Sequence, residues 1–117
     1  MKKFLLIVAL IAGCGDEDQS RDAADCTAAG ATQTTSVNLT DEAFSPVCVK
    51  VAKGAEVTFT NKDSMAHTVT TDSGQAESFD SGNMDQNATF KHVFATAGTI
   101  RAHCENHGGM HIAIVVE

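Results

Sequence analysis

Along most of the chain, hydrophobic and polar residues alternate with the period of a β-strand and never sustain a helical period. Val47, Val49 and Val51, for example, alternate with Cys48 and Lys50, as expected for a strand that buries one face. About seven to eight short antiparallel strands separated by turn residues indicate an all-β fold, a β-sandwich with Greek-key connections. The pattern predicts strands over residues 34–39, 47–51, 57–59, 67–71, 90–94, 99–104 and 112–116.

The N-terminal residues 1–13 are expected to be a signal peptide and not part of the fold. Lys2 and Lys3 precede an apolar run over residues 4–12 that is too short to span a bilayer. The run ends in the sequence LIAGC at residues 10–14, which resembles the lipobox of bacterial lipoproteins. This resemblance implies cleavage before Cys14, lipid attachment to its sulfur, and anchoring to a membrane of the cell envelope. The alternative is an ordinary secretory signal.

Two further regions follow the signal peptide. Residues 14–31 are rich in Ala, Asp, Gly, Ser and Thr and poor in large apolar residues, so they are expected to form a flexible tether. The folded domain is expected to cover residues 32–117.

The charge balance is acidic, with 8 Lys and Arg against 15 Asp and Glu and a net charge of −7. Removal of residues 1–13 takes away two lysines and no acid, which changes the net charge from −7 to −9. Nucleic acid is therefore excluded as a partner, since phosphate binding needs a basic face. An acidic surface suits a basic redox partner, although solubility alone also explains it.

The strongest chemical signal is the run Cys-Glu-Asn-His-Gly-Gly-Met at residues 104–110, together with His67 upstream. One thiolate, two imidazoles and one thioether are the ligands of a blue-copper electron-transfer site, with a trigonal His₂Cys plane and a weak axial Met. The alternatives are a buried inert Cys104, an ordinary strand histidine at position 67, and Met110 as core packing. Together the four residues favour copper.

Several motifs follow one another in order along the chain: Phe44-Ser45-Pro46, Gly54 to Asn61 with Asp63 and His67, Phe79 to Gly82, Phe90 to Phe94 with Gly98, and the Cys104 loop. These motifs make the chain similar to the cupredoxins, small blue-copper proteins that include plastocyanin and amicyanin. The likeness runs from about residue 34 to residue 117. It implies one copper ion per chain with His67, Cys104, His107 and Met110 as ligands, and one-electron transfer.

Two departures from the family pattern lie next to the predicted ligands. Cupredoxins often have an aromatic residue just before the ligand cysteine, where this chain has Arg101-Ala102-His103, and Thr68 stands where some members have Asn. The hydrogen bonds around the thiolate, and with them the reduction potential, are expected to differ accordingly. Neither departure removes a ligand.

The remaining cysteines, histidines and methionines are predicted to have structural roles. With Cys14 assigned to lipid and Cys104 to copper, Cys26 and Cys48 are left to form a disulfide in an oxidising compartment. Two unpaired thiols are the alternative. His92 is predicted to be a packed core histidine, and Met65 and Met84 are predicted to be packing residues. His103 and His111 are predicted to lie on the surface, with a weak second copper or zinc site as the alternative for that pair.

The sequence therefore predicts a monomeric electron carrier, lipid-anchored and facing the periplasm, that exchanges electrons with redox protein partners. His107 is the hypothesised electron port, with small and apolar neighbours. A copper-delivery or copper-scavenging lipoprotein is the second candidate. A copper enzyme is disfavoured, because it would need an open coordination position or a second metal site.

Overall fold

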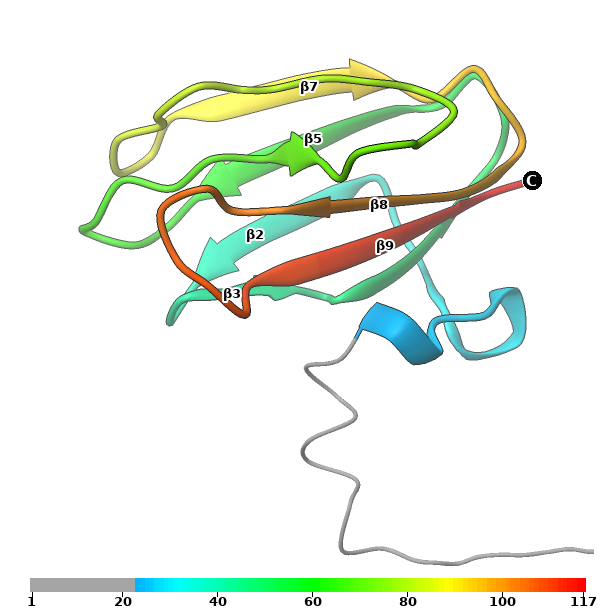
Figure 1. Cartoon of the computed structure of the whole chain (residues 1–117), viewed down its shortest axis with the longest axis horizontal. Coiled ribbons are helices and arrows are strands. Elements are labelled where there is room, and N and C mark those ends of the chain that lie inside the picture. Colours follow the sequence, from blue (N-terminus) through cyan, green and yellow to red (C-terminus); the bar gives the residue numbers. More distant parts are fainter. Residues whose placement is uncertain (1–22) are drawn as a thin grey trace, which may run out of the picture.

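The computed structural model describes residues 23–117, and the predicted signal peptide and Cys14 lie outside the described residues. Two β-sheets pack face to face, with the loop between β8 and β9 at one end of the sandwich and the C-terminus at the other (Figure 1). Within the described region the strands are β1 (Thr32–Gln33), β2 (Ser36–Thr40), β3 (Ala43–Ser45), β4 (Cys48–Val51), β5 (Glu56–Asn61), β6 (Thr70–Thr71), β7 (Thr89–Val93), β8 (Gly98–His103) and β9 (His111–Val116).

The predicted all-β sandwich is confirmed, but the expectation that all strands are antiparallel was wrong. One sheet has the order β1-β4-β9-β8-β6 and the other the order β3-β2-β5-β7. The pairs β1–β4, β2–β5 and β4–β9 are parallel. Some strands that are consecutive in the sequence, such as β4 and β5, lie in different sheets, whereas β2–β3 and β8–β9 pair within one sheet. Alternation of residue types reports which face is buried, not strand direction.

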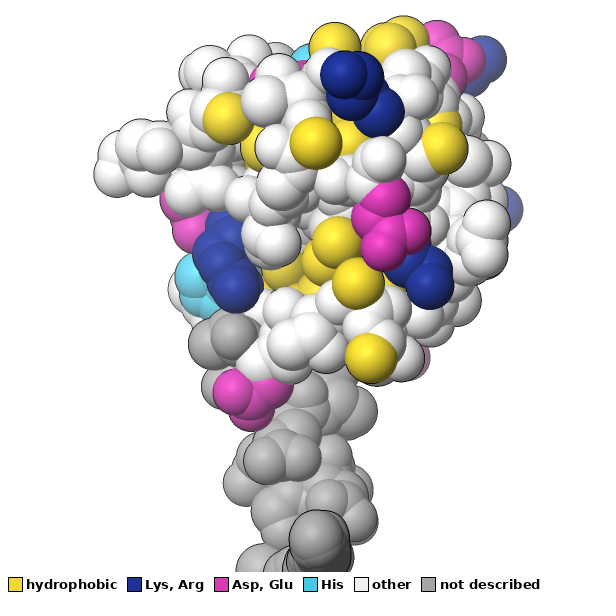
Figure 2. All heavy atoms as spheres, turned by 90° about the vertical axis from the view of Figure 1, so that its right-hand side faces the viewer, with side chains coloured by type: hydrophobic (Ala, Val, Ile, Leu, Met, Phe, Trp, Pro, Cys, Tyr) yellow, Lys and Arg dark blue, Asp and Glu magenta, His cyan; other side chains and the backbone are white. Residues whose placement is uncertain are grey.

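The core lies between the two sheets and is aliphatic with a few phenylalanines. Val49 and Val51 of β4 are buried as the alternation predicted, and Phe59 of β5 is fully buried. The largest fully buried hydrophobic side chains include Phe44, Phe59, Phe94, Leu39, Ile100, Met110, Ile112 and Ile114. Figure 2 views the end of the sandwich away from the β8–β9 loop, where hydrophobic side chains lie in small groups among charged and polar ones.

Residues 23–31, the second half of the segment expected to be a tether, lie against the sandwich. They include two short 3₁₀ helices, η2 (Ala23–Asp25) and η3 (Ala28–Gly30), and the backbone oxygen of Ala23 accepts a hydrogen bond from the Arg101 side chain. Cys26 and Cys48 are joined by a disulfide with an S–S distance of 2.05 Å. Within residues 23–117, no helix is long and apolar enough to cross a membrane.

Glu77 fastens the long connection between β6 and β7 to the far end of the sandwich. Its carboxylate lies 2.7 Å from His92 Nε2 and accepts the backbone N–H groups of Ala95 and Thr96 at 2.9 and 2.6 Å. His92 in turn packs against Phe79, with ring centroids 4.3 Å apart. Burial raises the pKa of Glu77, but the hydrogen bonds from His92, Thr96 and Ala95 outweigh it and hold this pKa below its usual value of 4.5.

We expect Glu77→Gln to lower the free energy of unfolding at pH 7 by about 2 kcal/mol, since hydrogen bonds to a charged group are lost. A carboxylate with a depressed pKa stabilises the fold above its usual pKa, and that contribution disappears as pH falls through the lower folded-state value. The stability gap between the wild type and Glu77→Gln should therefore shrink as the pH falls below 4.5. Urea unfolding at several pH values measures it, with the exposed Glu56→Gln as control. A gap that stays constant down to pH 3 would contradict this assignment.

Candidate metal centre

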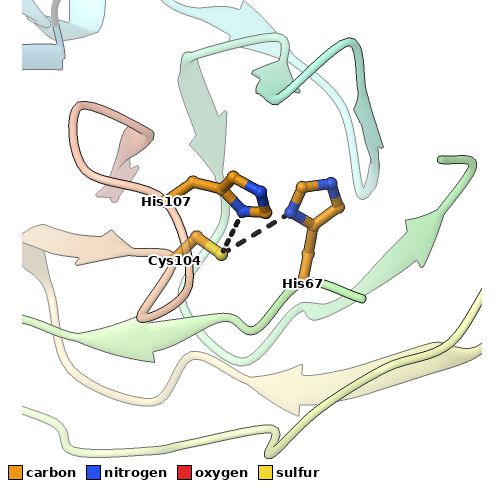
Figure 3. Close-up of side chains that lie close together, drawn as sticks. All are labelled: His67, Cys104 and His107. Carbon is orange, nitrogen blue, oxygen red and sulfur yellow. Dashed lines mark hydrogen bonds between the residues drawn. The ribbon is translucent and has the colours of Figure 1, made fainter. Parts of the chain in front are cut away.

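Three side chains that are far apart in the sequence converge at one end of the sandwich. Cys104 Sγ lies 3.6 Å from His67 Nδ1 and 3.8 Å from His107 Nδ1, and the two imidazole centroids are 4.6 Å apart. Figure 3 shows both rings turned toward the sulfur. Of the residues that the structure describes, these are the ones that gather three such donor atoms within 4.8 Å of one another.

The spacing of these donors fits a trigonal metal site. With metal–sulfur and metal–nitrogen bonds of about 2.3 and 2.0–2.1 Å, an angle of about 120° places nitrogen and sulfur about 3.8 Å apart. The two observed separations, 3.6 and 3.8 Å, agree with that value. Cys104 is a free cysteine that is only 4% exposed, so the sulfur is available to a metal and shielded from solvent. A soft thiolate with two imidazoles favours copper or zinc over hard cations.

The backbone around His67 is fixed from two sides. His67 lies just before β6 in an isolated bridge to Met84, and the two residues exchange backbone hydrogen bonds of 3.2 and 2.9 Å. The side-chain amide of the fully buried Asn61 donates to the backbone oxygens of Met65 and Met84 at 2.9 and 2.7 Å. Asn61 therefore ties the loop before His67 to the segment that pairs with it.

The Asp63 carboxylate orients the His67 ring. Asp63 Oδ2 lies 2.7 Å from His67 Nε2, and the same carboxylate accepts the backbone N–H groups of Asp41 and Glu42 at 2.8 and 3.0 Å. The Glu42 N–H, with further help from His67 and the Asp41 N–H, holds the pKa of Asp63 below its usual value despite partial burial. An ionised carboxylate can only accept, so His67 donates through Nε2 and keeps the Nδ1 lone pair for a metal.

Asp63 also supports an unfavourable turn. Asp41 and Glu42 connect β2 and β3 and have positive φ angles of 55° and 57°, a conformation that hairpin turns usually fill with Asn or Gly. The two hydrogen bonds to Asp63 offset the backbone strain at these positions. The turn and the orientation of His67 therefore depend on the same side chain.

Thr68 connects the two segments that carry the donors. Its backbone N–H points at Cys104 Sγ at 3.3 Å, and its hydroxyl oxygen accepts the backbone N–H of Glu105 at 2.9 Å. The Cys104 N–H donates to the backbone oxygen of Met110 at 3.0 Å, which closes the loop on itself. Thr68, the residue that departs from the family pattern next to His67, therefore holds both the sulfur and the start of the ligand loop.

Comparison with known proteins identifies the fold family. A profile of the family described as "Cupredoxin-like domain" matches residues 4–116 of the chain. The chain belongs to the cupredoxin family. Its cofactor is copper, and the residues present at the site are a His-Cys-His-Met set. A search of curated protein sequences finds no significant match.

Solved structures agree with the family assignment of this cupredoxin. The reduced Cu(I) form of an amicyanin variant at pH 4 is 27% identical, covers 81% of this chain and 89% of its own, and superposes with a TM-score of 0.67. Two others show the fold alone. A purple cupredoxin from Nitrosopumilus maritimus is 22% identical, covering 70% of this chain and 98% of its own (TM-score 0.63). A copper-containing nitrite reductase from Thermus scotoductus is 21% identical, covering 80% of this chain and 25% of its own (TM-score 0.67).

His107 and Met110 lie at different depths in this cupredoxin. Met110 is only 2% exposed, whereas His107 is half-buried. His107 lines a surface hollow together with Gly108 and the acidic Asp41–Glu42 turn. The ring therefore reaches from the buried sulfur to the surface, and Met110 lies on the inner side of the loop.

Other predicted positions give a mixed result. Met84 is buried as expected, but the prediction that Met65 packs in the core was wrong, because Met65 is 42% exposed. Met65 lies on the loop that Asn61 and Asp63 fix before His67, so its backbone is held while its side chain faces outward. His103 and His111 lie outside the three-donor cluster. The roles of Asn61 and Asp63 were missed. Their contacts with Met65 and His67 span four residues, but those with Met84, Asp41 and Glu42 join loops that are distant in the sequence.

We expect Asp63→Asn to weaken copper binding by about 10–100-fold, the usual effect of losing a partner that orients a ligand histidine. The loss of a negative charge beside His67 should also make the reduction potential of bound copper more positive, because Cu(II) is stabilised less. Chelator competition and voltammetry measure the two effects.

The matched control is Asp85→Asn, which removes an exposed carboxylate from the loop before β7. The role of Asp63 would be refuted by an unchanged potential and affinity in a folded Asp63→Asn protein.

Proposed function

We propose that this cupredoxin is a one-electron carrier with a mononuclear type I copper site, and that copper would be held there by His67, Cys104, His107 and Met110. The observation that carries the proposal is the preformed cluster of two Nδ1 atoms and one sulfur at 3.6 and 3.8 Å. Donors already at coordination spacing need little movement when a metal binds or changes oxidation state. Bound copper supplies the Cu(II)/Cu(I) couple.

The protein's contribution is rigidity and shielding. Asp63 and the Met84 bridge fix His67, while Thr68 fixes both the thiolate and the start of the ligand loop. These contacts keep the donors in one arrangement regardless of the charge on the metal. The near-complete burial of Cys104 keeps water from the thiolate side. A site that neither rearranges nor rehydrates favours rapid electron transfer over substrate chemistry.

His107 is proposed as the electron port. Its half-buried ring lines the surface hollow beside Gly108 and Gly109, and neither glycine has a side chain to cover the ring edge. The exposed Met65 and the acidic turn of Asp41 and Glu42 line an adjoining hollow. A partner that docks here approaches His107 closely.

The surroundings of this port suggest the chemistry of the partner and the location of the protein. The two hollows are lined by Asp41, Glu42 and Asp63 and by no Lys or Arg. The opposite end of the sandwich shows both acidic and basic side chains (Figure 2). The acidic lining of the hollows suits a redox protein with a basic docking face. The Cys26–Cys48 disulfide supports an oxidising, extracytoplasmic location. We place the carrier at the cell envelope, monomeric and anchored by lipid on Cys14.

The full-length chain with one equivalent of Cu(II) should show an intense blue absorption band and narrow copper hyperfine splitting in its EPR spectrum. Both features require direct bonding between copper and the Cys104 thiolate, so Cys104→Ser should abolish them while leaving the fold intact. Ordinary tetragonal copper spectra from the wild type would refute the electron-carrier proposal. That result would instead favour copper delivery, in which the metal is held by exchangeable ligands.

The port assignment predicts that Gly108→Leu slows electron transfer without changing the copper site. A Cβ added at Gly108 meets no other atom within 4 Å, so the variant should fold, bind copper and keep its spectrum. The leucine would cover the His107 edge and reduce the electron self-exchange rate by about tenfold or more, an effect equivalent to roughly 1.4 kcal/mol in the barrier. The control is Thr99→Leu, an exposed position on β8. Equal self-exchange rates in the wild type and Gly108→Leu would disprove the port at His107.

A further inference from the structure

The outer face of β8 and β9 carries a second pair of histidines. His103 and His111 are direct register partners at the end of this antiparallel pair. The neighbouring residues Cys104 and Met110 are joined by a backbone hydrogen bond, so His103 and His111 form the adjacent non-hydrogen-bonded pair, in which side chains lie closest together. Their ring centroids are 6.4 Å apart.

That separation is within reach of a shared metal ion. With metal–nitrogen bonds of about 2.0–2.1 Å, the centres of two imidazoles on one ion are about 5.2 Å apart at a tetrahedral angle and about 6.4 Å apart when the two nitrogens lie on opposite sides of the ion. The observed 6.4 Å is at the upper end of this range. Because the His111 side chain is exposed, it can rotate toward His103 without disturbing the core.

Two carboxylates prepare His103 for this role. Asp72 Oδ1 lies 2.6 Å from His103 Nδ1, and Glu105 Oε2 lies 2.8 Å from His103 Nε2. A carboxylate on one ring nitrogen is the usual device that orients a histidine whose other nitrogen binds a metal. Asp72 therefore directs Nε2 of His103 outward, where the 55% exposed Glu105 side chain already places an oxygen beside it.

We propose that His103, His111 and Glu105 form a second cation site, separate from the copper centre, for a borderline divalent metal such as Zn²⁺ or Cu²⁺. Two imidazoles and a carboxylate suit these ions, and solvent completes the coordination. These three donors lie farther apart than those of the copper site. Among the described residues, the donor atoms that lie within 4.8 Å of one another are those of His67, Cys104 and His107. The site therefore closes around the metal when it binds. We expect a dissociation constant in the micromolar range, so that the bound metal exchanges with metal in solution.

The second site lies on the opposite face of the strands from the copper donors. Cys104 and Met110 point into the core at 4% and 2% exposure, while His103 and His111, one residue away on each strand, point outward. His111 also lines the hollow that contains His107. A cation bound there adds positive charge at the rim of that otherwise acidic hollow.

The test is calorimetric titration of Zn²⁺ into the copper-loaded protein reduced to Cu(I), so that the first site is already filled. The wild type should bind one further Zn²⁺ with micromolar affinity. His111→Ala should weaken this binding at least tenfold, and Glu105→Gln should weaken it several-fold. Glu56→Gln, which removes another exposed glutamate, on β5, should bind Zn²⁺ like the wild type. Unchanged blue absorbance on reoxidation checks that Zn²⁺ has not displaced copper.

Zinc affinity that is the same in the wild type and His111→Ala would overturn the proposal, as would a wild type that binds no Zn²⁺ at 100 μM, about a hundred times a micromolar Kd. The result does not depend on electron-carrier function. If copper fails to load, the apo wild type should take up two Zn²⁺ and His111→Ala only one. Equal uptake by the two apo proteins would refute the second site in that case too.

Discussion

The hydrogen bond between Asp63 and the buried His67 ring is the contact on which the metal centre depends. It settles which nitrogen carries the proton, so that Nδ1 faces Cys104 Sγ at 3.6 Å with its lone pair free. Without this acceptor, a fully buried imidazole would leave a polar nitrogen unpaired, at a cost of about 1–3 kcal/mol. The described residues contain no buried side-chain nitrogen or oxygen that lacks a partner. Hydrogen bonds between buried polar groups therefore position the donor atoms without help from a bound metal.

The sandwich makes this organisation possible by bringing distant segments to one end. His67 follows β5 of one sheet and precedes β6 of the other, whereas Cys104 and His107 lie in the loop that joins β8 and β9. Contacts across that end then lock the segments together, through Asn61 on the side of His67 and Thr68 between the two donor segments. Because both strands flanking the ligand loop are central in their sheet, movement of the loop is resisted at both of its ends.

The sequence was sufficient for the parts of this structure that depend on residue type and local period. Cys104, His107 and Met110 could be recognised from their chemistry and spacing, and Val49 and Val51 from alternation. Asp63 was not assigned although it lies only four residues before His67, because the other contacts that fix its carboxylate come from Asp41 and Glu42, 22 and 21 residues away in the chain. The strands β1 and β3 have two and three residues, too few to show a period. The burial of Met65 was wrongly predicted because a hydrophobic residue type does not reveal that Asn61 holds the Met65 backbone in a loop from which the side chain faces outward.

The period of two along β8 and β9 explains how one short stretch can serve two metal-binding roles. Consecutive residues of a strand face opposite sides, so His103-Cys104 and Met110-His111 each put one donor into the core and one on the surface. Inside, the donors are fixed at coordination spacing and shielded, which suits a metal that stays bound through many oxidation changes. Outside, His103 and His111 are more accessible, and the ring separation of 6.4 Å must shrink for tetrahedral coordination. Such a site favours rapid exchange. The two sites thus differ both in burial and in ligand type, with a thiolate and a thioether inside and a carboxylate outside, and both differences favour permanent binding inside and exchangeable binding outside.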